Sequence, residues 1–148
     1  EVIGLATMIG LLDIVFVLVG GGAWSSQPGP FGPLDTAALT LFIVGSLLNT
    51  GSEFQRKRWK SNPANHGHCY TEGLFRHAMH INYFGDVVLF TGLALLTRNA
   101  WTLLVPAGML WGFATYHIPT LDTYLEQRYG EEFRTYRKKT KRLIPFVW

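Results

Sequence analysis

The stretch Gly73-Leu74-Phe75-Arg76-His77-Ala78-Met79-His80-Ile81-Asn82-Tyr83-Phe84-Gly85-Asp86 joins a cluster of polar and ionisable residues to an apolar segment. The apolar segment runs from Ile81 to Thr97 and carries no charged residue beyond Asp86. Polar groups that enter a membrane segment are costly, and they mark functional positions by default. The stretch therefore predicts an apolar helix with a functional site at its beginning.

Four apolar segments run along the chain of 148 residues, of which 48% are hydrophobic: Val2–Gly22, Leu34–Leu48, Ile81–Thr97 and Trp101–Ile118. A helix needs about 20 apolar residues to cross a hydrocarbon core of about 30 Å. The second and third segments are short for this, so a buried helical hairpin in a soluble bundle is their alternative. We predict an all-α fold, a multi-pass transmembrane helical bundle of about four spans that forms a single domain over residues 1–148.

Positive charge is confined to two regions of the sequence. All of the 13 Lys and Arg residues except Arg98 lie within residues 56–76 or 128–142. With four spans these two regions share one face of the membrane, and the positive-inside rule makes that face cytoplasmic, or stromal or matrix in an organelle. The net charge of +3 is then a matter of topology and of anionic membrane lipids. We predict no nucleic-acid partner, because no recognisable binding module is present.

The C-terminal region reads as an amphipathic helix over Leu121–Arg137. Large apolar or aromatic residues recur there at helical spacing, with charged residues between them: Leu121, Leu125, Tyr129, Phe133 and Tyr136. Gly130 is expected to weaken this helix near its middle. The spacing predicts that one face of the segment packs on the rest of the protein.

A metal site is not expected. His66, His68 and Cys69 lie close together in the sequence. However, no second His or Cys pair follows at the spacing of a structural zinc site. The single cysteine also excludes an intrachain disulfide.

The polar end of the second predicted helix carries one stripe of functional groups. Asn49, Glu53, Lys57 and Lys60 are at i, i+4, i+8 and i+11, which places them within a sector of about 80°. Lysine ammonium groups suit phosphates, and a carboxylate with an amide suits a ribose or an adenine edge. The alternative is a solvated helix end with a Glu53–Lys57 pair.

A second stripe begins the third predicted helix. Asn82 and Asp86 are one turn apart, and Tyr83 is their neighbour. Asp86 lies about one turn inside the apolar segment, so its carboxylate must be paired, hydrated or protonated. Arg76, Lys57 and Lys60 are candidate partners on the same membrane face. The alternative is an internal polar clamp between helices.

A series of motifs, taken in order and spacing, resembles the C-terminal region of the steroid 5α-reductase-like membrane proteins over residues 34–148. The superfamily also contains sterol reductases and isoprenylcysteine carboxyl methyltransferases. The motifs are Asn49-x-x-x-Glu53-x-Gln55-x-x-x-Trp59-Lys60, Asn62-Pro63-Ala64-Asn65-x-Gly67, Gly73-Leu74-Phe75-Arg76, Asn82-Tyr83-Phe84-Gly85-Asp86, Tyr129-Gly130-Glu131-Glu132-Phe133 and Leu143-Ile144-Pro145-Phe146.

The resemblance implies an all-helical membrane protein with a cofactor pocket on its cytosolic side. Reductase members bind NADPH there and pass hydride to an activated C=C bond of a lipid, while methyltransferase members bind S-adenosylmethionine in the corresponding half. By this resemblance the polar groups of the cofactor would contact Asn49, Glu53, Lys57, Lys60, Arg76, Asn82, Tyr83, Asp86 and, more weakly, Tyr124.

The first functional hypothesis is an NADPH-dependent reductase of a lipid, steroid or isoprenoid C=C bond, with Tyr83, Asp86 and His80 as the catalytic candidates. Met79 and Ile81 stand where the family commonly has Arg and Pro, and losing an Arg removes a phosphate donor. The alternative is therefore a catalytically silent structural or lipid-organising subunit of a larger membrane complex. A further alternative is an S-adenosylmethionine-dependent methyltransferase, whose cofactor has no 2′-phosphate that demands Lys or Arg.

Overall fold

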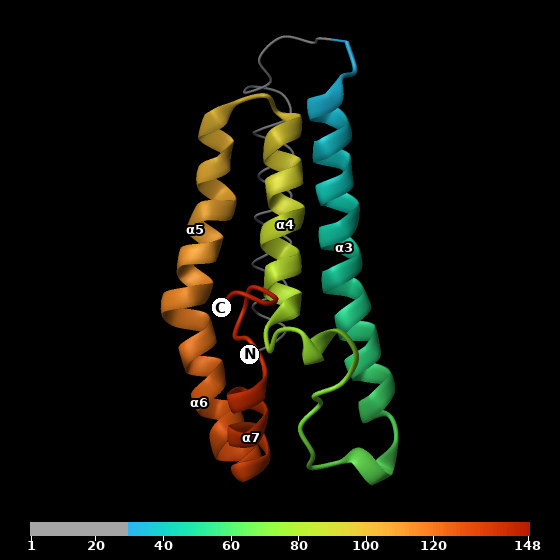
Figure 1. Cartoon of the computed structure of the whole chain (residues 1–148), viewed down its shortest axis with the longest axis vertical. Coiled ribbons are helices and arrows are strands. Elements are labelled where there is room, and N and C mark those ends of the chain that lie inside the picture. Colours follow the sequence, from blue (N-terminus) through green and yellow to red (C-terminus); the bar gives the residue numbers. More distant parts are fainter. Residues whose placement is uncertain (1–29) are drawn as a thin grey trace.

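A computed structural model of the chain describes residues 30–148, so the predicted first span, Val2–Gly22, lies outside the described residues. The main helices are α3 (Pro33–Lys60), α4 (Ile81–Leu96), α5 (Leu104–Gly112), α6 (Ile118–Tyr129) and α7 (Glu131–Lys139) (Figure 1). Over residues 30–148 the only extended pairing is an isolated bridge between Ala78 and Lys141. The predicted all-α class is confirmed.

Helix α3 continues well past its apolar part, as the sequence predicted. Gly32 is its N-cap residue, and the Asp35 carboxylate accepts a hydrogen bond of 2.8 Å from the Gly32 N–H. The last turn carries three cations, which suit the negative end of the helix dipole: Lys57, Arg58 and Lys60. Within the described residues, α3 is the one helix that is long and apolar enough by itself to cross a membrane, and α4 is a shorter apolar helix.

Helices α3 and α4 pack with their backbones in contact. A Cβ atom added at Gly45 would lie 2.3 Å from the Leu89 nitrogen, and one at Gly92 would lie 2.6 Å from the Ala38 oxygen. The same holds at Gly85, where the nearest atom would be a backbone nitrogen at 2.6 Å. Glycine is therefore required at these positions, as in the close helix pairs of membrane proteins.

The helix of the fourth predicted span continues beyond Ile118. A π-helical turn, η5 (Phe113–His117), connects α5 directly to α6, and the helix runs through Pro119 (Figure 1). Proline has no N–H to donate and would normally break a helix interior. The wider π turn lies directly before this proline, where a regular α-helical hydrogen bond is lost, and π turns of this kind are frequent at functional sites.

The prediction of one amphipathic helix over Leu121–Arg137 is wrong in one respect. The helix is interrupted at Gly130, whose φ of 54° and ψ of −123° favour glycine. Helix α7 begins at the next residue. The predicted apolar face is nevertheless present in both pieces. Phe133 and Tyr136 of α7, with partly buried Leu125 and Tyr129 of α6, pack around Cys69 and Met79. The turn thus lets α7 cover the loop that precedes α4.

Candidate functional site

The two predicted polar stripes face each other between α3 and α4. The Asn49 side-chain amide donates to the Asp86 carboxylate and, at 3.4 Å, to the Asn82 carbonyl oxygen. The Asn82 amide in turn donates to Glu53 Oε1 at 3.2 Å. We call these four residues, Asn49, Glu53, Asn82 and Asp86, the polar ladder.

The polar ladder explains how a carboxylate is held inside the apolar segment. Asp86 is buried, and a buried carboxylate needs a donor. The sequence suggested a cation for this role, namely Arg76, Lys57 or Lys60. The structure instead places the Asn49 amide on the carboxylate. These hydrogen bonds are those of the predicted polar clamp between helices. They also bring together amide and carboxylate groups that a ribose or an adenine edge would bind.

Tyr83 lies beside the polar ladder in a stack of three rings. Its ring is parallel to that of His80 at 5.8 Å between centroids and to that of Phe113 at 4.6 Å, each with an interplanar angle of 9°. Phe113 comes from the π turn η5. The stack restricts the orientation of the Tyr83 phenol ring, because two parallel rings pack against it.

His80 itself is held in a buried ionic cluster. Its Nε2 lies 2.8 Å from Asp122 Oδ1, and Arg142 Nε donates to the other carboxylate oxygen of Asp122 at 2.9 Å. Burial would raise the pKa of the Asp122 carboxyl, but the hydrogen bond from His80 and the charges of His80 and Arg142 outweigh burial and hold that pKa below its usual value. These contacts connect α6, which carries Asp122, and the segment after α7, which carries Arg142, to the beginning of α4.

Sequence reasoning missed Asp122, Arg142 and Phe113. One signal for Asp122 was present, because it lies four residues after Ile118 and three before Leu125, within an apolar stripe. A carboxylate at such a position is normally paired. The pairing with His80 is a long-range contact, and no local pattern in the sequence indicates it.

The other side chains that were predicted to contact the cofactor lie in different parts of the molecule. Lys57 is exposed in the last turn of α3, and Lys60 Nζ donates to the Tyr129 hydroxyl at 3.3 Å. Arg76 instead lines a hollow against α7, and Tyr124 is exposed and accepts a hydrogen bond of 2.6 Å from Arg128. Neither Arg76 nor Tyr124 is brought to the polar ladder.

The histidine-rich loop forms no evident metal centre. Within residues 30–148, no three His, Cys, Asp or Glu side chains are placed so that they could hold a metal ion together. The exposed His68 ring lies 3.4 Å from the Glu132 carboxylate, and the Cys69 N–H donates to the same side chain at 3.1 Å. Burial raises the pKa of the Cys69 thiol to about 11, so the thiol is protonated and unsuited to metal binding.

Comparison with known proteins assigns the chain to a family. A family model described as "Protein of unknown function (DUF1295)" matches residues 7–140, and the chain belongs to this family. A probable O-methyltransferase from Ustilaginoidea virens is 30% identical over 122 residues, 80% of this chain and 43% of the relative. A 3-oxo-5-alpha-steroid 4-dehydrogenase 1 from Rattus norvegicus is 33% identical over 119 residues, 78% of this chain and 42% of the relative.

A third relative is, by its name, an isoprenylcysteine methyltransferase, the methyltransferase class named by the resemblance. The protein-S-isoprenylcysteine O-methyltransferase of Schizosaccharomyces pombe is 27% identical over 122 residues, which cover 79% of this chain and 52% of the relative. The membership in the steroid 5α-reductase-like superfamily is therefore confirmed. The chain spans about half the length of the curated relatives that it matches.

Proposed function

We propose that the chain is part of a membrane-embedded, lipid-modifying enzyme, and that its reaction is the NADPH-dependent reduction of a lipid, steroid or isoprenoid C=C bond. The observation that carries the proposal is the polar ladder, with Tyr83 beside it and with Lys57 and Lys60 further along the same stripe of α3. The substrate would lie in the membrane between helices.

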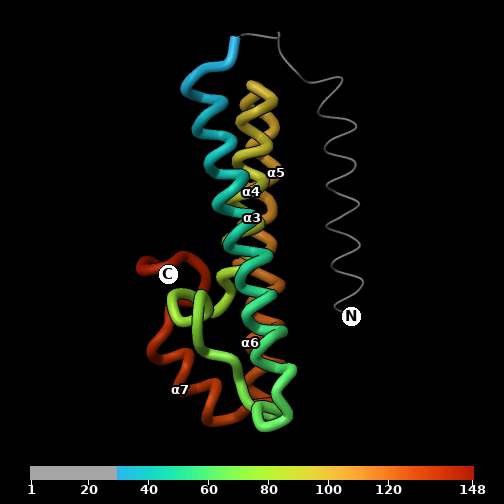
Figure 2. Tube along the Cα trace, turned by 90° about the vertical axis from the view of Figure 1, so that its right-hand side faces the viewer, coloured from blue at the N-terminus to red at the C-terminus, as the bar shows by residue number. Residues whose placement is uncertain are grey.

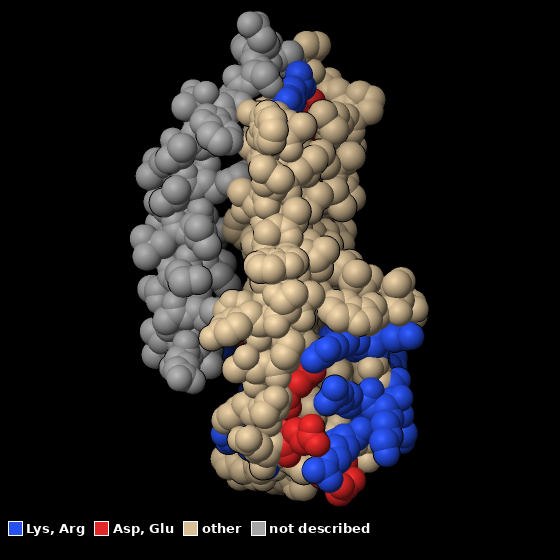
Figure 3. Space-filling model, turned by 90° about the vertical axis from the view of Figure 1, so that its left-hand side faces the viewer, with Lys and Arg blue, Asp and Glu red and all other residues tan. Residues whose placement is uncertain are grey.

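A membrane setting is supported by the surface of α3. Its outer side chains are large, apolar and exposed, and only 17% of its most apolar window is buried. The exposed residues include Leu39, Phe42, Ile43, Val44, Leu47 and Phe54. An apolar surface of this extent is unusual on a soluble monomer. Figure 3 shows the charged residues gathered at one end, with a long uncharged surface above them and one further charged pair at the opposite end.

That distribution favours the multi-pass topology predicted from the charges. The pair at the opposite end is Arg98 with Asp35, joined at 2.6 Å. The remaining cations lie on or beyond α3, η3 (Gly73–Arg76), α6 and α7 at the end that carries the polar ladder. In this orientation the polar ladder lies nearer to the cytoplasmic, stromal or matrix face.

The donor set near the polar ladder fits NADPH. The two lysines can contact phosphate groups, and the Glu53 carboxylate with the Asn82 amide can contact sugar hydroxyls or an amide. When bound, NADPH supplies the hydride. The protein would fix its position, exclude water and present the Tyr83 hydroxyl for proton transfer, with Asp86 keeping Asn49 oriented. His80 would act as a positioning residue, because its ring is buried in the pair with Asp122.

Binding of NADPH to the detergent-purified full chain tests the proposal. We expect saturable binding that S-adenosylmethionine does not compete, and a loss of at least tenfold in affinity for Asn82→Ala and Lys60→Ala. Lys138→Ala is the matched control, because Lys138 is exposed on α7 at the same end of the molecule. Failure of the folded wild type to bind NADPH would contradict the reductase proposal, and failure to bind S-adenosylmethionine as well would leave a catalytically silent subunit as the alternative.

A methyltransferase is the second candidate, since two of the relatives above are O-methyltransferases by name. The 2′-phosphate of NADPH requires cations, whereas S-adenosylmethionine carries no phosphate. Binding of S-adenosylmethionine that is unaffected by Lys60→Ala but lost in Asn82→Ala would favour this candidate over the reductase.

A further inference from the structure

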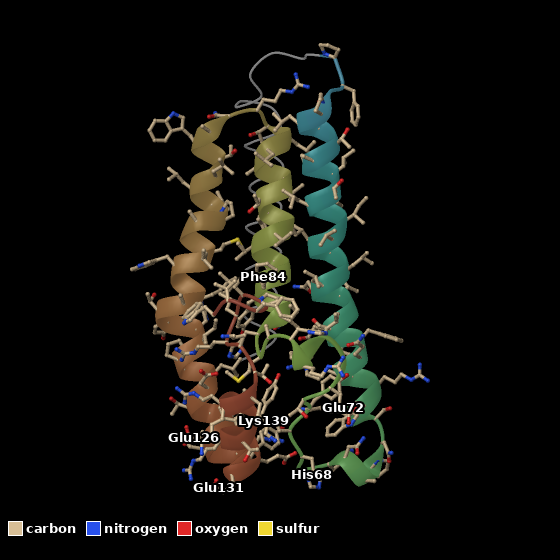
Figure 4. All side chains as sticks on the ribbon, viewed as in Figure 1. His68, Glu72, Phe84, Glu126, Glu131 and Lys139 are labelled. Atoms are coloured by element: carbon tan, nitrogen blue, oxygen red, sulfur yellow. The ribbon has the colours of Figure 1, made fainter. Side chains whose placement is uncertain are left out.

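The hollow that Arg76 lines lies between η3 and α7, and no residue of the polar ladder lines it. Its volume is about 570 Å³. Arg76 and Lys139 supply cationic groups to its lining, and three threonines supply hydroxyls: Thr71, Thr135 and Thr140. Figure 4 places Lys139 on the side of α7 toward the loop that carries Glu72. The hollow therefore offers two cations and several donors at one place.

The two carboxylates that also line the hollow have partners of their own. Glu131 pairs with Arg134, and Glu132 accepts the Cys69 N–H and faces the His68 ring. Arg76 and Lys139, in contrast, are exposed and form no salt bridge with any residue of the described range 30–148. Neither cation is held in a salt bridge within residues 30–148, so both side chains can turn to an anion that enters the hollow.

An exposed apolar segment lies next to these cations. Phe146 and Val147 are 79% and 70% exposed, and the Phe146 ring lies 5.7 Å from that of His77, the neighbour of Arg76. The C-terminal segment projects sideways from the bundle at the level where α4 begins, above α7 (Figure 2). Figure 3 shows the cationic surface directly below this projection. Apolar groups toward the membrane with cations below them are the arrangement of an interfacial lipid contact.

We propose that this C-terminal foot, defined as Arg76, Lys139, Phe146 and Val147, binds the headgroup of an anionic phospholipid. The headgroup phosphate lies in the hollow at Arg76 and Lys139, and the acyl chains run past Phe146 and Val147 into the membrane. Only a ligand that has both a phosphate and apolar chains uses the two halves of the foot together. The inference rests on the proposed membrane setting, but not on the reaction or on nucleotide binding.

Native mass spectrometry of the full chain, in detergent micelles containing equal amounts of phosphatidylglycerol and phosphatidylcholine, tests the proposal. We expect phosphatidylglycerol to be retained preferentially. Lys139→Gln and Arg76→Gln should each reduce this preference by about fivefold, the effect of one cation at a membrane surface. Lys138→Gln is the matched control on the same helix and should leave the preference unchanged, because Lys138 does not line the hollow.

Two further arms separate the alternatives. Phe146→Ser should reduce retention of phosphatidylglycerol, whereas displacement of the lipid by millimolar inorganic phosphate would identify a site for free anions and overturn the lipid proposal. Equal retention of both lipids, or equal effects of Lys138→Gln and Lys139→Gln, would also overturn it. NADPH binding measured on the same samples reports on the proposed reaction separately, since the foot contains no residue of the polar ladder.

Discussion

The interface between α3 and α4 has two halves that are built differently. Toward Ala38 and Gly92 the backbones touch, and a single added methyl group would meet main-chain atoms. Toward Glu53 and Asn82 the same helices are joined by side-chain amides and carboxylates. The first half can only hold the helices together. The second half holds them with groups that can also turn to a polar ligand, so stability and binding should separate along one helix pair.

The ionic cluster at the edge of the polar half should give the largest effect on stability. Asp122→Ala leaves the His80 ring and the Arg142 guanidinium without the carboxylate that they share, and breaking a buried ion pair typically costs about 3–5 kcal/mol. We expect a loss of that size in denaturant unfolding in detergent. Glu126→Ala, one turn further along α6, removes only exposed pairs and should change stability little. Equal effects of the two substitutions would contradict the role assigned to the cluster.

We call the half of the interface that contains Gly45 and Gly92 the glycine half. Replacing glycine by alanine should lower stability inside this half and raise it at an open position elsewhere. Gly45→Ala places a methyl group against the backbone of α4, and we expect a destabilisation of about 3 kcal/mol because no flexible side chain can move away. Gly108→Ala meets no atom of residues 30–148 within 4 Å and should stabilise α5 by about 0.5–1 kcal/mol through helix propensity. Thermal unfolding of both variants measures the difference, and a shared sign would refute close packing at Gly45.

In the polar half, which contains the polar ladder, a substitution should change NADPH binding more than it changes stability. Asn82→Ala removes the amide that donates to Glu53 and is expected to cost only about 1 kcal/mol of stability. The same change should weaken NADPH binding at least tenfold. Isothermal titration and thermal unfolding on one preparation give both values. A large loss of stability with unchanged affinity would mean that the polar ladder is only a clamp.

The smallest effect is expected at Tyr124, although the family resemblance implied a cofactor contact there. Its hydroxyl is exposed and accepts a hydrogen bond from Arg128 on the surface of α6. Tyr124→Phe should therefore leave NADPH affinity unchanged within error, whereas Tyr83→Phe should lower turnover. A clear loss of affinity in Tyr124→Phe would place the cofactor further along α6 than we propose.

Much of the helical framework follows from local sequence. The extension of α3 to Lys60 and the start of α4 at Ile81 were predicted, because apolar periodicity and helix-breaking residues are local signals. The break at Gly130 and the continuation through Pro119 were not, because each depends on a backbone conformation that tertiary packing selects. Likewise, each polar stripe was predicted separately, but the pairs Asn49–Asp86 and His80–Asp122 join residues 37 and 42 positions apart.

Hydrogen–deuterium exchange of the full chain with and without NADPH tests most directly the claim that the two halves of one interface have different roles. We predict that NADPH slows exchange in residues 49–60 of α3 and 81–86 of α4. Exchange in residues 38–45 and 92–96, in the glycine half, should stay unchanged. Equal protection of both halves, or protection of the glycine half alone, would contradict the account.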